Sequence, residues 1–193
     1  GIGEAPQLSP TYGQYDNGAS VFSLYWNFSG TSLPNRWVSN GYGSYSVNNG
    51  ITVYNGSTSA EIIYFSNTIN PQIYVVDFYG YSNSTDSKIG LSAGGAFLGN
   101  PSYFIDPNYY LDNYNGSYST VEIYPSASHS SCSLWSMWAS STSSFASYNY
   151  SVIANNPNNF GLSTSMYIQL STSRPNYVYM QWLRTRAYPP NGV

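Results

Sequence analysis

The sequence has only eight acidic side chains, and the chemistry that they could perform is the easiest to state. Cleavage of a glycosidic bond needs two carboxyl groups about 5 to 10 Å apart, one protonated and one ionised. Glu61, Asp77 and Glu122 fall in segments with strand character, so two of them could meet across a sheet. Carboxylates on strands are more often hydrogen-bonded structural groups. The sequence favours that interpretation, and no residue is assigned a catalytic role.

The single histidine and the single cysteine lie close together in a Ser-rich segment, at His129 and Cys132. Neighbouring Ser, His and Cys residues do not make a nucleophile and base, because those groups meet through folding. One histidine cannot build a multi-histidine zinc site, and one cysteine excludes an intrachain disulfide. The sequence therefore predicts a loop histidine beside a buried cysteine.

Oxygen-bearing side chains gather between positions 106 and 116. Calcium prefers carboxylate, amide and backbone oxygens, and Asp106, Asn108, Asp112 and Asn113 could supply them. Their spacing matches no EF-hand loop, and a turn-rich solvated loop is the interpretation that the sequence favours. No cofactor is required, and calcium is the one that the sequence leaves open.

Tyrosine occurs 22 times and could bind a ligand. Its ring can stack on a sugar while its hydroxyl forms a hydrogen bond. Two sets could form such a platform: Tyr74, Tyr177 and Tyr179 on strands, and Tyr109, Tyr110 and Tyr114 on a loop. The alternative is that tyrosine replaces charged residues on a sheet surface.

The elements that must position these residues are strands, because apolar residues alternate with polar ones and no 3.6-residue period is sustained. Asn49-Gly50 predicts a two-residue hairpin between strands at 45–47 and 51–54. Further strands are expected at 61–65, 73–79, 88–92, 120–124, 148–153, 165–170 and 177–184. Residues 134–140 are predicted to be a strand or an aromatic-lined loop rather than a helix. This spacing predicts an all-β, two-sheet antiparallel sandwich.

The chain length fits one domain, predicted to span residues 1–193. Residues 1–20 are expected to form a Pro/Gly-rich lead-in and residues 187–193 a Pro-rich exit segment. Such segments join surface modules. The sequence therefore suggests one module of a longer protein.

Charge is scarce: 7% of the residues are charged, the net charge is −3, and Lys88 is the only lysine. Without a basic run, binding to nucleic acid is excluded as a function. Arg184 and Arg186 are expected on one face of a final strand rather than in a basic patch. No apolar run is long enough to cross a bilayer, so no direct membrane insertion is expected.

Five Asn-x-Ser/Thr sequons occur, at Asn27, Asn55, Asn83, Asn115 and Asn149. They are candidate glycosylation sites of a secreted protein. Together with the near absence of lysine and the lone cysteine, they predict an extracellular or cell-surface location.

One resemblance goes beyond composition. Tyr25-Trp-Asn-Phe-Ser-Gly, then Arg36-Trp37 and the hairpin around Asn49-Gly50, resemble the opening of concanavalin A-like lectin/glucanase jelly rolls. Residues 179–186 look like the last strand of the same modules. Residues 13–19 and 188–192 are similar to phrases in archaeal surface proteins that carry the DUF2341-type module. The resemblance implies a jelly-roll sandwich whose concave sheet can hold a glycan.

The same resemblance argues against catalysis, because the glucanase members carry a Glu-x-Asp-x-x-Glu strand that this chain lacks. The leading prediction is therefore a non-catalytic glycan-binding or adhesion module of a cell-surface protein or appendage, and not an enzyme. One alternative is a structural subunit of an extracellular filament or sheath, assembled from copies of the chain by strand pairing. The other is a polysaccharide hydrolase or lyase whose acids are brought together by folding.

Overall fold

This computed structural model contains strands and no helices in the residues that it describes. It describes residues 22–55, 59–84, 87–97, 99, 101–106, 110–123, 131–158, 164–173 and 175–187. The strands are β1 (Leu24–Trp26), β2 (Trp37–Ser39), β3 (Ser44–Val47), β4 (Ile51–Asn55), β5 (Glu61–Ile69), β6 (Tyr74–Ser82), β7 (Ser87–Ser92), β8 (Ser102–Asp106), β9 (Tyr110–Tyr114), β10 (Tyr118–Glu122), β11 (Ser133–Ala139), β12 (Ser144–Tyr148), β13 (Ser151–Asn156), β14 (Met166–Thr172) and β15 (Asn176–Ala187). Among these residues, no helix is long and apolar enough to cross a membrane.

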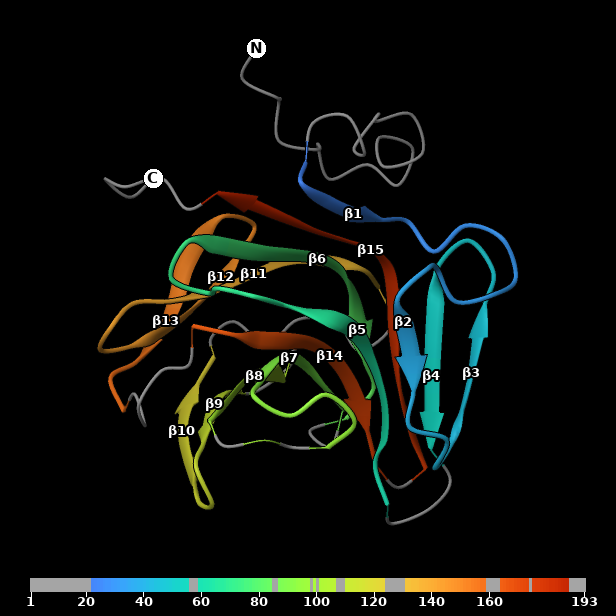
Figure 1. Cartoon of the computed structure of the whole chain (residues 1–193). Coiled ribbons are helices and arrows are strands. Elements are labelled where there is room, and N and C mark those ends of the chain that lie inside the picture. Colours follow the sequence, from blue (N-terminus) through green and yellow to red (C-terminus); the bar gives the residue numbers. More distant parts are fainter. Residues whose placement is uncertain are drawn as a thin grey trace.

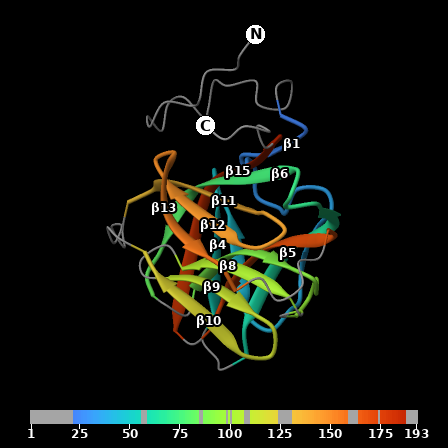
Figure 2. The ribbon, with the colours of Figure 1, turned by 90° about the vertical axis from the view of Figure 1, so that its left-hand side faces the viewer.

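The strands form two antiparallel sheets packed face to face (Figures 1 and 2). Sheet A has the order β13-β12-β11-β6-β15-β4-β3, and β1 pairs with β15. Sheet B has the order β10-β9-β8-β7-β14-β5-β2. Figure 1 shows sheet B arched, with its hollow side turned away from sheet A. The predicted all-β, two-sheet jelly-roll sandwich is confirmed.

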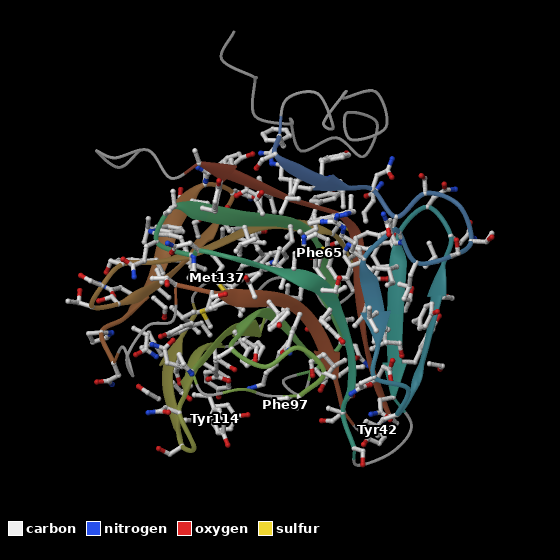
Figure 3. The ribbon with its side chains drawn as sticks, in the orientation of Figure 1. Tyr42, Phe65, Phe97, Tyr114 and Met137 are labelled. Carbon is white, nitrogen blue, oxygen red and sulfur yellow. The ribbon has the colours of Figure 1, made fainter. Side chains whose placement is uncertain are left out.

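The core lies between the sheets and follows from the alternation of side chains along each strand. Phe78 of β6, Trp135 of β11 and Leu170 of β14 point inward and are fully buried. Phe65 and Met137 lie in the same layer (Figure 3). Each such side chain contributes about 1.5–3 kcal/mol by leaving water.

The phrase that carried the family resemblance has a packing role. Phe28 and Trp37 are buried, and their ring centroids lie 5.3 Å apart. Trp26 meets Trp37 edge-on at 5.2 Å and Phe65 at 4.6 Å. These aromatic contacts fasten β1 of sheet A and β2 of sheet B to the same end of the core.

The predicted hairpin is confirmed between β3 and β4. Asn49 and Gly50 have φ angles of 49° and 139°, which asparagine and glycine tolerate. A Cβ at Gly50 would lie 2.5 Å from the Tyr179 hydroxyl oxygen. Only glycine therefore fits at this turn without displacing its neighbour.

Two local predictions are wrong. The continuous strand expected at 148–153 is a hairpin, because Asn149 and Tyr150 adopt φ angles of 48° and 65° between β12 and β13. The turn-rich loop expected at 106–116 contains β9, which pairs with β8 and β10 in sheet B. The segment predicted at 134–140 does form a strand, β11 (Ser133–Ala139), which is buried throughout.

The predicted single domain remains a prediction at its ends. Residues 1–20 and 188–193 lie outside the described residues, and Ala187 is the last residue of β15.

Candidate functional site on the concave face

The outer face of sheet B gathers polar and aromatic side chains from six neighbouring strands. Inward-facing residues such as Ile89 and Leu170 alternate with outward-facing ones. One outward row crosses the sheet through Tyr64, Gln169, Gly90, Phe104, Asp112 and Thr120. This hollow side of the arch is where a large ligand would meet the sheet.

A cavity of about 450 Å³ opens on this face. Its lining includes three strongly exposed aromatic side chains: Tyr42 at 66%, Phe97 at 65% and Tyr118 at 52% of their surface. Figure 3 shows Tyr42 and Phe97 on the hollow side of the arch, away from the core. Binding cavities commonly have volumes of about 300–1,000 Å³, so the space can hold a short piece of a chain-like ligand.

Two loops position Tyr42 and Phe97, and Asn40 joins these loops. Its side-chain amide donates to the carbonyl oxygens of Ala60 at 3.0 Å and Ala96 at 3.4 Å. Its side-chain oxygen accepts hydrogen bonds from the backbone N–H groups of Tyr42 and Ile62. The loop after β2 is thereby held against the loop after β7.

Lys88 and Asp112 form the charged centre of this face. The Lys88 ammonium is ion-paired with Oδ2 of Asp112 and lies 4.4 Å from the centre of the Tyr118 ring. The Thr120 hydroxyl donates to Oδ1 of Asp112 at 2.8 Å. Both oxygens of this nearly buried carboxylate therefore have a partner, which fixes its position on the sheet.

A second carboxylate lies close by, at Glu122 on β10. Asp112 is opposite Thr120, and Glu122 is two residues further along the same strand, so the two acids share a face. Diagonal neighbours of this kind have Cα atoms about 7–8 Å apart. Asp106 of β8 is in register with Tyr110, which is in turn in register with Glu122.

The predicted tyrosine platforms are divided between the two sheets. Tyr110 and Tyr114 lie on β9 of sheet B, and the Tyr114 ring is 4.8 Å from that of Tyr118. Tyr177 and Tyr179 lie on β15 and flank Tyr81 on the outer face of sheet A, at 6.1 and 5.3 Å. Tyr74 packs against the core instead. Tyr109 is outside the described residues.

Of the residues predicted to bind calcium, the structure describes the side chains of Asp112 and Asn113, which point to opposite sides of β9. Asp112 faces outward, whereas the adjacent Asn113 is buried on the inner side. Asn113 accepts from the Ser144 hydroxyl and donates to the Asn158 carbonyl at 2.8 Å. Asp112 and Asn113 thus cannot share one ion. Asn108 and the side chain of Asp106 are outside the description, and the described residues contain no cluster of three metal-binding side chains.

Two other acids named from the sequence have structural partners. Glu61 is fully buried, and accepts from the Ser39 hydroxyl and from the backbone N–H of Gly43, both at 2.5 Å. Asp77 lies in the other sheet and pairs with Arg184 and Arg186. The expected position of both arginines on one strand face is confirmed, and Glu61 and Asp77 cannot act together.

The five sequons differ in accessibility. Asn27, Asn115 and Asn149 are exposed, and Asn83 is half-buried. Asn55 is 3% exposed and donates to the Thr172 carbonyl at 3.2 Å. A glycan on Asn55 is incompatible with this packing.

Cys132 is the free thiol of the chain and packs against Tyr79 and Trp182, whereas His129 lies outside the described residues. Burial raises the pKa of Cys132 to about 11. Because the thiolate is the reactive form, alkylation of the native protein by iodoacetamide should accelerate only toward pH 11. In urea the same reaction should accelerate around the ordinary thiol value of 9.0. Equal pH profiles for the native and unfolded protein would contradict this environment.

The sequence analysis missed Tyr42, Phe97, Tyr118 and Lys88 as site residues. The first three lie in or beside turns, where no alternation marks them. A signal was present for Lys88, because it is the only lysine and lies on a predicted strand.

The site and fold can be compared with known proteins. No family model matches the chain. "Uncharacterized protein 562" of Sulfolobus islandicus rod-shaped virus 1 is 26% identical over 231 aligned positions, covering 99% of this chain and 40% of that protein. The chain thus spans about two fifths of the length of this relative.

Solved structures share the fold at low sequence identity. The laminarinase from Rhodothermus marinus superposes with a TM-score of 0.65 and 9% identity, covering 87% of this chain and 98% of that one. SCLam, a non-specific endo-β-1,3(4)-glucanase from family GH16, superposes with a TM-score of 0.64 and 9% identity, covering 85% of this chain and 89% of that one. A structure reported with the endo-acting O-glycanases of human gut microbiota superposes with a TM-score of 0.63 and 10% identity, covering 87% of this chain and 100% of that one.

These matches confirm the concanavalin A-like jelly roll and correct the predicted function. The solved structures named above are those of glycan-cleaving enzymes. They contradict the prediction of a non-catalytic binding module that is not an enzyme. The link to DUF2341-type archaeal modules stays a prediction.

Proposed function

We propose that this chain is a polysaccharide hydrolase that binds a glycan on the hollow face of sheet B and cleaves it between Asp112 and Glu122. One observation carries the proposal: an aromatic-rimmed cavity and two carboxylates share one face of the sheet. The solved enzymes with this fold supply the reaction class.

The aromatic side chains give the face its affinity for sugars. Tyr42, Phe97 and Tyr118 expose more than half of their surface around one cavity. The C–H groups of a pyranose ring pack against such aromatic faces, and tyrosine adds a hydroxyl for hydrogen bonding. A neutral or weakly charged glycan suits this lining, since Lys88 is compensated by Asp112.

Asp112 is the carboxylate that receives the proton of the attacking water. The Lys88 ammonium and the Thr120 hydroxyl hold it in place on the sheet. A fixed anion of this kind can take a proton from an attacking water or stabilise the positive charge that develops on the anomeric carbon.

Glu122 is the acid of the pair. It donates a proton to the glycosidic oxygen as the bond from that oxygen to the anomeric carbon breaks. Water adds to the anomeric carbon and gives a proton to Asp112. The two carboxyl groups then exchange this proton with solvent, so the net reaction is addition of one water across the bond.

The proposed pair of carboxylates is not a single-strand motif like the missing Glu-x-Asp-x-x-Glu. Asp112 and Glu122 come from two adjacent strands joined by the turn at 115–117, rather than from one strand. A local motif search cannot find such a pair. We also propose that the enzyme acts outside the cell, because the sequons at Asn27, Asn115 and Asn149 are exposed.

The lone lysine provides a direct probe of glycan binding. Lys88 lines the cavity, and its side chain is 19% exposed. We expect a bound polysaccharide to slow acetylation of Lys88 several-fold and to leave the reaction of the N-terminal amine unchanged. Peptide mass spectrometry reads both rates in one sample. Equal slowing of both amines, or of neither, would count against binding at this face.

Incubation with a panel of polysaccharides tests the reaction class. We expect new reducing ends from at least one of them, without the unsaturated product that a lyase leaves. Unsaturated products would replace the hydrolase by a lyase. No product from any member of the panel would contradict the proposed function.

A further inference from the structure

In the loop between β7 and β8, residues 93–97 and 99 lie on the hollow face of sheet B. The side-chain amide of Gln169, on the floor of this face, donates to the carbonyl oxygens of Gly94, Gly95 and Phe97, the last at 3.1 Å. The Ser92 hydroxyl oxygen accepts from the backbone N–H groups of Gly94 at 3.1 Å and Gly99 at 2.9 Å. These bonds hold the loop to the sheet from both ends.

Glycine allows the loop to approach this closely. A Cβ at Gly95 would lie 2.9 Å from Cε2 of Tyr64, so the backbone rests directly on that ring. Tyr64 belongs to β5 and Gln169 to β14. The loop therefore covers the hollow face around Tyr64 and Gln169, whereas Ile62 and Ser171 of the same two strands line the cavity.

Gln169 is 0% exposed beneath the loop, although it belongs to the outward face of sheet B. The backbone carbonyl groups that it contacts account for this burial. The hydrogen bond from Asn40 to Ala96 joins this loop to the β2–β3 loop. Together the two loops form a wall beside the cavity.

The edge of the face at β10 is open. Thr120, Glu122 and Tyr118 are exposed on β10, at the edge of the sheet. The cavity extends from Tyr118 and Lys88 to Tyr42 and Asn40. A ligand that enters across β10 reaches Asp112 and then meets the wall made by the two loops.

We propose that the enzyme acts on chain ends: one end of a polysaccharide enters across β10 and stops in the cavity between Tyr42 and Phe97. This inference rests on the proposed function and specifies its substrate as a glycan terminus. The cavity of about 450 Å³ accepts only a short terminal piece. Two of the similar enzymes are by contrast described as endo-acting or as an endo-glucanase.

The distribution of products over time tests the inference. With a polysaccharide that the wild-type protein cleaves, we expect one short product of fixed size from the earliest time points, while the viscosity of the solution falls slowly. A ladder of many sizes at early times, with a rapid fall in viscosity, would overturn the chain-end inference and leave the hydrolase intact. Absence of any product would contradict both the chain-end inference and the proposed hydrolase function.

Weakening the loop gives a second test. Gln169→Ala removes the hydrogen bonds to the loop, and Asn40→Ala removes its contact with the β2–β3 loop. Both variants should release longer products than the wild type. Gln72→Ala, at an exposed turn before β6, is the matched control and should keep the wild-type pattern. If Gln169→Ala does not fold, the product sizes released by Asn40→Ala and by the wild type still test the inference. Unchanged product sizes from a folded Asn40→Ala variant would contradict the claim that the two loops stop the ligand.

Discussion

Replacing Asp77 by alanine is expected to lower the free energy of unfolding by about 3–5 kcal/mol. Asp77 is fully buried on the outer side of sheet A, where its Oδ2 accepts from Arg184 at 3.0 Å and Arg186 at 2.9 Å. Arg184 is itself only 2% exposed. The substitution leaves a guanidinium without its counter-ion in a site that water barely reaches, and that penalty dominates the change.

Urea unfolding measures this effect, with Glu122→Ala as the control at an exposed acid. Exposed substitutions change stability by about 0.5 kcal/mol or less. A further variant that combines Asp77→Leu with Arg184→Met and Arg186→Met should recover most of the loss, because it removes the buried charges together. A change below about 1 kcal/mol for Asp77→Ala would mean that water reaches the cluster.

The second large effect is on catalysis. Asp112→Asn should lower kcat by about 10²–10⁴-fold, because an amide can neither take the proton nor supply the negative charge. The amide still offers an oxygen to the Thr120 hydroxyl but loses the ion pair with Lys88, so kcat is compared only on folded protein. Stopped assays of reducing ends, made on protein with an unchanged circular dichroism spectrum, measure the loss.

Glu61→Gln is the matched control for this change. Glu61 is also a carboxylate of sheet B, but its partners are Ser39 and Gly43, and it has no place in the row that carries Asp112. Its substitution can alter stability and should leave kcat of the folded enzyme within a few-fold of the wild type. Equal losses of kcat in the two variants would show that Asp112 has no special role.

The architecture could be predicted from the sequence because the information is local. Alternation along each strand marks the core face, as at Ile89 and Leu91, and Asn49-Gly50 marks the hairpin. The buried pair of Phe28 and Trp37 explains why a short aromatic phrase identified the fold. The turn at Asn149 was missed because the flanking residues have strand propensity on both sides.

The site could not be predicted because it depends on which strands become neighbours. Lys88 and Asp112 are 24 positions apart, and Gln169 and Gly95 are 74 apart. Alternation shows which residues share a face of one strand, but it does not give the strand order of a sheet. The argument against an enzyme rested on a missing local motif, whereas the proposed pair of carboxylates spans a hairpin.

The cleavage assay on the wild-type protein and on an Asp112→Asn, Glu122→Gln double variant tests the central claim most directly. Both proteins are given the same polysaccharide panel, and new reducing ends are counted. Hydrolysis by the wild type, with no product above background from a folded double variant, is the result that this account predicts. Equal product from the two proteins would place the chemistry away from the hollow face of sheet B, and no product from either would contradict the assignment as a hydrolase.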